Sequence, residues 1–172
     1  MKTYLVLTLI GNDQLGLVES LAQIVAQHQG NWLESNMSRL AGKFAGILRV
    51  SVEESQAEAL VAALDALSPR LKLIVERSAQ AETEKPQRTL RLSLVGNDRP
   101  GIIRDISGAL ARQHVNVDDL DTECVPAPMS SDTLFRAEAL LHIPAELDIE
   151  TLRAELERLA DDLIVDINLI AD

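Results

Sequence analysis

The chain has few of the residues with which proteins bind nucleic acid. Aromatic side chains make up 2% of its 172 residues, and acidic residues exceed basic ones to give a formal net charge of −11. Residues 1–86 carry a net charge of −2, whereas residues 87–172 carry −9. Contacts between basic side chains and phosphates dominate affinity for DNA and RNA. We therefore expect no direct binding to nucleic acid, and a role at DNA would need a second protein.

Cysteine and long apolar runs are also scarce. The single cysteine, Cys124, excludes an internal disulfide and is typical of a reducing compartment. No apolar run approaches the roughly 20 residues of a membrane-spanning helix. The alternating residues near the amino terminus differ from the core of a signal peptide. We therefore expect a soluble, cytoplasmic protein that does not bind membranes.

The sequence lacks a complete set of residues for nucleotide, metal or covalent chemistry. Two glycine pairs have the spacing of a phosphate-binding loop, but Leu17-Val18 and Ile102-Ile103 stand where Lys and Ser or Thr would be required. Neither His28 nor His114 has a second His or a Cys within a helical turn. Cys124 has no base near it in the sequence. We expect no cofactor, no metal and no catalytic residue.

What the chain does contain is one turn motif, present twice, as Gly-Asn-Asp-Gln-Leu-Gly at 11–16 and Gly-Asn-Asp-Arg-Pro-Gly at 96–101. Each copy follows an alternating apolar run and precedes an apolar pattern of helical spacing, which predicts a strand, a turn and a helix. The same offset of 85 positions relates further pairs, namely Thr8 and Ser93, Leu21 and Ile106, Ala26 and Ala111, and Asn31 and Asn116. The chain is therefore two copies of one unit.

Two interpretations of this turn remain open. In the first, Asp13 and Asp98 cap the helices that follow, Pro100 lies in the first helical turn, and the motif serves folding alone. In the second, free N–H groups at the helix start bind a carboxylate, while the Asn and Asp side chains hold an ammonium or amide group.

Apolar periodicity predicts the order strand, helix, strand, strand, helix, strand in each unit. In the first unit, residues 1–78, we expect these elements at 3–10, 15–29, 31–41, 44–52, around 60–67 and at 71–75. In the second unit, residues 88–172, we expect them at 88–95, 100–114, 116–125, 133–143, 148–161 and 163–170. The polar stretch 79–87 lacks periodicity and is expected to be a linker.

This order is that of the ferredoxin-like motif, so the expected fold class is α+β. Each unit should form a four-stranded antiparallel sheet with both helices on one face. The second strand of each unit should lie at a sheet edge, and an exposed edge can pair with another strand. We therefore expect the two units, or units of two chains in a homo-oligomer, to join their sheets there.

An acidic cluster stands in the second strand of the second unit. Because side chains alternate along a strand, Asp119, Asp121 and Glu123 should share one face. They could bind a cation or a ligand ammonium group, or they could form a solvated edge that resists aggregation.

A small hydrolase of the acylphosphatase type also shares this fold. It would need a loop that holds an anion, together with a nearby Arg and Asn, for which Asn97, Arg99 and Arg104 are candidates. The first unit has Gln14 and Glu19 in place of the two arginines, so only the second unit could carry such a site. Fold analogy alone is weak support.

The tandem arrangement, with Gly-Asn-Asp-Arg-Pro-Gly-Ile-Ile at 96–103 and Gly-Asn-Asp-Gln-Leu-Gly-Leu-Val at 11–18, resembles tandem ACT domains. The arrangement of the whole chain resembles the glycine cleavage system transcriptional repressor family. The resemblance implies a non-enzymatic regulator that senses a small ligand, usually an amino acid, and controls transcription through a DNA-binding partner protein. The alternatives are a ligand-independent interaction or oligomerisation module and, more distantly, the hydrolase.

The resemblance also implies a ligand site at the first strand-to-helix loop of each unit and the adjoining edge strand of a neighbouring unit. The implied loop residues are Asn12, Asp13, Leu15, Gly16 and Leu17 in the first unit, and Asn97, Asp98, Pro100, Gly101 and Ile102 in the second. The implied strand residues are Asn31, Asn36, Asn116 and Asp121. The first unit departs from the motif, because it has Gln14-Leu15 in place of Arg-Pro.

Overall fold

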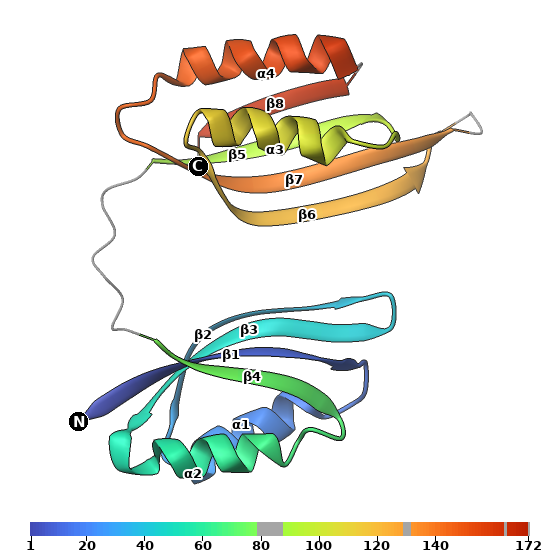
Figure 1. Cartoon of the computed structure of the whole chain (residues 1–172). Coiled ribbons are helices and arrows are strands. Elements are labelled where there is room, and N and C mark those ends of the chain that lie inside the picture. The colour runs from blue at the N-terminus through green and yellow to red at the C-terminus, as the bar shows by residue number, and fades with distance from the viewer. Residues whose placement is uncertain (79–87, 129–131, 164, 172) are drawn as a thin grey trace. The chain divides into compact units, whose positions relative to one another are not determined.

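The computed structural model describes residues 1–78, 88–128, 132–163 and 165–171, and the chain divides into two compact units, one within 1–83 and one within 84–172 (Figure 1). The first unit comprises β1 (Lys2–Asn12), α1 (Leu17–Gln27), β2 (Asn31–Leu40), β3 (Lys43–Glu53), α2 (Glu54–Asp65) and β4 (Leu71–Ser78). The second comprises β5 (Arg88–Asn97), α3 (Ile102–Arg112), β6 (Asn116–Pro126), β7 (Thr133–Ile143), α4 (Ile149–Leu163) and β8 (Val165–Ala171). Both have the predicted order of elements, while the predicted linker at 79–87 lies outside the described residues.

Each unit contains one antiparallel sheet of four strands. The strand order is β2-β3-β1-β4 in the first unit and β6-β7-β5-β8 in the second, which confirms the expected ferredoxin-like topology. Both helices of a unit cover the same face of its sheet (Figure 1). The strands β2 and β6 lie at sheet edges, as the topology predicts.

Aliphatic side chains fill the space between helices and sheet. In β1, alternate residues Leu5, Leu7 and Leu9 are almost completely buried, and they belong to the same core cluster as Leu21 of α1 and Leu60 of α2. Burying one such side chain contributes about 1.5–3 kcal/mol relative to leaving it exposed. The second unit repeats the pattern with Leu90, Leu92 and Leu94 of β5 against α3 and α4. The alternation therefore fixes which face of each sheet is left uncovered.

The first helix of each unit begins two residues later than predicted, because a glycine precedes it in the left-handed region. Gly16 has φ 81° and Gly101 has φ 96°, and no side chain caps either helix within the described residues. The expectation that Asp13 and Asp98 cap these helices is therefore wrong, and Pro100 lies before the helix. The N–H groups of Asp13 and Asp98 instead extend the strand ladder, donating to the carbonyls of Gly42 (3.0 Å) and Thr133 (2.8 Å).

Within the described residues, helix α4, unlike α1 and α3, has a side-chain cap at its N-terminus. The Asp148 carboxylate accepts from the N–H groups of Glu150 and Thr151, each at 3.3 Å, and from the Thr151 hydroxyl at 2.8 Å. Chiefly the hydroxyl, and then the Glu150 N–H, hold the pKa of Asp148 below its usual range. The uncapped starts of α1 and α3 thus differ from α4 in leaving their first amides without a side-chain acceptor.

Both edge strands contain a β-bulge at equivalent positions. The pairing register shifts between Trp32 and Glu34 in β2, and between Val117 and Asp119 in β6. Beyond the second bulge, Asp119, Asp121 and Glu123 pair with Leu140, Glu138 and Arg136 of β7, residues that alternate with the buried Ala137, Ala139 and Leu141. The three acidic residues therefore share the face of the sheet opposite to the helices, as predicted.

Candidate functional site

In each unit, a buried apolar residue follows the turn between the first strand and the first helix, and in the first unit the turn also contains an exposed one. In the first unit, Leu15 is 98% exposed, whereas Leu17 is 3% exposed and anchors α1 in the core. Ile102 is 2% exposed and anchors α3 in the same way. The side chains of Leu17 and Ile102 therefore serve the core, and these residues can offer a ligand only their backbone.

The first turns of α1 and α3 present backbone donors. The carbonyl of Gly16 accepts from the N–H of Ser20 at 2.9 Å and from its hydroxyl at 2.8 Å, and the Gly101 carbonyl accepts from the N–H of Asp105 at 3.0 Å. These bonds satisfy the two glycine carbonyls. The N–H groups of the first helical turn, by contrast, have no side-chain acceptor in the described part of either unit. Such free amides and the helix dipole favour an anion.

The two turns differ in the state of their Asn and Asp side chains. In the first unit, Lys43 Nζ donates to Asn12 Oδ1 at 2.6 Å, and Arg39 Nη1 lies 3.3 Å from Asp13 Oδ2. Within the described residues, the side chains of Asn97 and Asp98 form no such bond. The second turn thus has a carboxylate and an amide available for a ligand, whereas those of the first are already paired.

The arginines proposed for a hydrolase share one carboxylate. Arg104 Nη2 lies 2.8 Å from Asp105 Oδ1, and Arg99 Nη2 lies 3.9 Å from Asp105 Oδ2. This single carboxylate can offset only one of the two positive charges, and an acyl phosphate would have to compete with Asp105 for the arginines.

The predicted strand residues fall into two groups. Asn36 pairs with Ile47 and Asp121 pairs with Glu138, partway along their edge strands. Asn31 pairs with Ser51 of β3, whereas Asn12 of the turn pairs with Lys43 of the same strand. Ser51 and Lys43 are eight residues apart along β3, so Asn31 lies roughly 27 Å from the turn. Asn116 lies equally far from the second turn, because it pairs with His142 while Asn97 pairs with Leu134. Within one unit, therefore, the fold does not bring Asn31 or Asn116 to the turn.

Asp121 lies in a shallow cavity on the uncovered face of the second sheet. The cavity has a volume of about 450 Å³, and its charged lining residues are Asp121, Glu123, Arg136 and Glu138. Arg136 Nη1 lies 3.6 Å from Glu123 Oε1. The contribution of β7 was missed from the sequence, although the alternation of Arg136 and Glu138 with buried alanines could have indicated it.

A second cavity, of about 390 Å³, lies at the end of β1 in the first unit and includes the predicted residue Asn12. Its lining also contains Lys43, Arg70 and Lys72. This grouping is not visible in the sequence, because its members come from three separate segments.

No group of three or more His, Cys, Asp and Glu residues among the described residues is arranged to hold a metal ion. Cys124 is exposed, and His142 Nδ1 lies 3.7 Å from Asp118 Oδ1. In the ranges that the structure describes, no helix is long and apolar enough to cross a membrane.

Two βαββαβ units, each with a glycine-started first helix, define the class of tandem ferredoxin-like proteins. Models of the ACT domain family match residues 3–78 and 90–161. The chain therefore belongs to the ACT domain family and carries two ACT domains in tandem. Membership of this family supports a ligand-sensing regulatory role.

The chain is also similar to individual proteins. A UPF0237 protein of Methanocaldococcus jannaschii is 34% identical over 77 residues, which cover 44% of this chain and 79% of the relative, and one of Methanopyrus kandleri is 30% identical over the same extent. A protein of unknown function from Galdieria sulphuraria has a similar structure, with a TM-score of 0.89, 27% identity and coverage of 100% and 99% of the two chains. A candidate glycine cleavage system transcriptional repressor shares the fold, with a TM-score of 0.73, 17% identity and the same coverage.

Proposed function

We propose that the chain is a non-enzymatic regulator that binds a small amino acid and controls transcription through a DNA-binding partner protein. The observation that carries this proposal is the uncapped, glycine-started first helix of each ACT domain. It offers backbone donors for a carboxylate beside an Asp that can hold an ammonium group. The acidity of the chain supports an indirect action on DNA.

The second domain offers the better of the two sites. There the ligand carboxylate binds the first-turn amides of α3, and Asp98 holds the ammonium group without giving up another partner. In the first domain the ligand must displace Arg39 from Asp13. That pair is 72% and 34% exposed, so its loss costs at most about 1 kcal/mol.

Regulation requires that the ligand distinguish two arrangements of the protein. A ligand shifts such an equilibrium only by its difference in affinity for the two states. We propose that a neighbouring edge strand, β2 or β6, completes the site in a homo-oligomer and supplies residues such as Asn36 or Asp121. Binding then favours the joined arrangement that the partner protein recognises.

A ligand-independent interaction module is the second candidate, and one observation favours it. The uncovered face of the first sheet carries Ile10, Ile47 and Ile74, which are 46%, 54% and 63% exposed. Exposed apolar patches mark interaction surfaces. Such a module would assemble with a partner protein whether or not an amino acid is present.

The test is a thermal-shift screen of the full chain against the amino acids, including glycine and serine. A ligand that prefers the native state raises the melting temperature as its concentration increases. Asp98→Ala should abolish most of the response, whereas Asp161→Ala, an exposed Asp in α4, should leave it unchanged. A flat screen, together with unchanged capture of the partner protein, would support the interaction module instead.

A further inference from the structure

We infer that the first domain carries a separate site for a small anion with two or more negative charges, such as a phosphate, a phosphate monoester or a dicarboxylate. The site is the cavity of about 390 Å³ at the end of β1, which we call the basic pocket. It is lined by Ile10, Gly11, Asn12, Lys43, Ser68, Pro69, Arg70 and Lys72. This inference does not rest on the amino-acid site proposed above.

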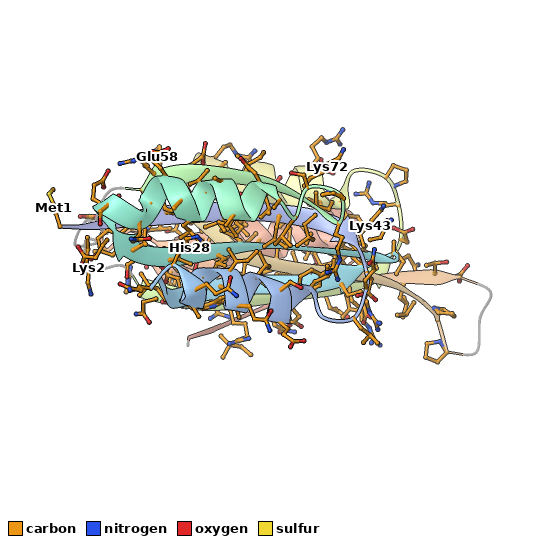
Figure 2. All side chains as sticks on the ribbon, turned by 90° about the horizontal axis from the view of Figure 1, so that it is seen from below. Met1, Lys2, His28, Lys43, Glu58 and Lys72 are labelled. Carbon is orange, nitrogen blue, oxygen red and sulfur yellow. The ribbon has the colours of Figure 1, made fainter. Side chains whose placement is uncertain are left out.

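The sheet register places the two lysines on the strands that flank β1. Lys43 at the start of β3 pairs with Asn12, and Lys72 near the start of β4 pairs with Ile10, so both lie beside β1 on the uncovered face. Figure 2 shows Lys43 and Lys72 at the same end of the first domain, opposite to Met1 and Lys2. Arg70 joins them from the loop that leads into β4.

A close backbone approach shapes the pocket. A Cβ atom at Gly11 would clash with the carbonyl oxygen of Arg70 and with the side chain of Leu71. Glycine at position 11 therefore lets the segment 68–70 lie against the end of β1. This contact places the backbone of Arg70 at the pocket, while its guanidinium reaches Leu15 and Ser20 at the start of α1.

The positive charges of the pocket are not offset by carboxylates. Lys43 donates to the neutral amide of Asn12, while Arg70 donates to the Ser20 hydroxyl and the Leu15 carbonyl, each at 3.4 Å. Among the described residues, none of the three cations forms an ion pair, and no Asp or Glu lines the pocket. Clustered charges of one sign in a concave site attract ligands of the opposite charge.

The second domain lacks this cluster, which indicates that the cluster is not a requirement of the fold. In the first domain Asn12 pairs with Lys43, whereas the equivalent Asn97 of the second domain pairs with Leu134. Val95 stands where Ile10 stands in the first domain, and its partner is Asp166 rather than a lysine. The counterpart of Lys43 is thus the apolar Leu134, and that of Lys72 is the acidic Asp166. The basic pocket therefore belongs to the first domain alone.

The test is a titration of the full chain, at constant ionic strength, with inorganic phosphate, succinate and acetate, followed by backbone amide NMR shifts. We expect saturable shifts at Gly11, Asn12 and Lys72 with phosphate or succinate, and much weaker ones with monovalent acetate. A response to phosphate alone would identify a phosphate site, and a response to succinate alone a dicarboxylate site. Equal responses to all three anions, or no saturation, would overturn the inference.

Substitutions locate the site. Lys72→Gln removes a charge without breaking a bond in the described structure, and it should weaken phosphate binding at least fivefold. Lys2→Gln removes the same charge at a position eight residues along β1 from Ile10, the partner of Lys72, which corresponds to roughly 27 Å. It should change affinity less than twofold. Because a phosphate monoester gains its second charge near pH 6, its binding should strengthen between pH 5.5 and 7.5 in the natural chain. Unchanged affinity in Lys72→Gln would contradict the inference.

A further variant separates this site from the amino-acid site. Asp98→Ala should abolish most of the amino-acid response and leave phosphate binding intact, whereas Lys72→Gln should weaken phosphate binding and leave the amino-acid response intact. Failure of the amino-acid screen would therefore leave the basic pocket standing, and failure of the phosphate titration would leave the proposed sensor standing.

Discussion

At the scale of single residues, the conformation of Gly101 determines where α3 begins. With φ 96° it adopts a backbone conformation that costs other residues about 1–3 kcal/mol. Gly101→Ala should therefore lower the free energy of unfolding by about that amount. Gly108→Ala, inside the same helix, should raise it by about 0.5–1 kcal/mol, because its Cβ would meet only Arg112 Nη1 at 3.7 Å. Urea denaturation followed by circular dichroism would measure the stability of both variants. A change of the same sign in the two variants would contradict the different backbone requirements of Gly101 and Gly108.

At the scale of elements, β6 combines one repulsive and one attractive cross-strand pair. Asp121 stands directly opposite Glu138, and Glu123 stands opposite Arg136. Such pairs change stability by about 0.2–1 kcal/mol according to their charges. Asp121→Asn should therefore raise the free energy of unfolding by a few tenths of a kcal/mol, and Glu123→Gln should lower it.

High salt provides the control for this pair of variants. Because both effects are electrostatic and exposed to solvent, 1 M NaCl should reduce them strongly. If Asp121→Asn instead destabilised the domain at every salt concentration, the side chain would have a packing role that the cross-strand register does not show.

The elements themselves were largely predictable from the sequence. The alternation of Leu5, Leu7 and Leu9 indicated a half-buried strand because one face of β1 meets the helices and the other does not. The start of α3 was not predictable in the same way, since Asp98 is a good cap in isolation. Pairing of its N–H with the Thr133 carbonyl extends the strand instead, and this contact depends on a residue 35 positions away.

The candidate sites were less accessible to sequence analysis. The turns at 11–16 and 96–101 stand out because they are continuous in the chain and occur twice. The basic pocket does not, because Lys43, Arg70 and Lys72 meet only through the antiparallel register and the close approach at Gly11. Comparison of the two copies at the offset of 85 positions could have shown that they diverge here. It could not have shown that these three residues line one cavity.

At the scale of the whole molecule, duplication has produced two similar turns with different electrostatics, which predicts two unequal ligand sites. Isothermal titration of the full chain with the amino acid found by the screen should show a stronger site that Asp98→Ala removes and a weaker one that Asp13→Ala removes. Arg39→Gln frees the Asp13 carboxylate from an exposed pair worth at most about 1 kcal/mol, so it should strengthen the weaker site up to about fivefold. Equal affinities in the natural chain, unaffected by Arg39→Gln, would show that pairing with Arg39 does not limit ligand binding and that the two domains respond as equivalent sensors.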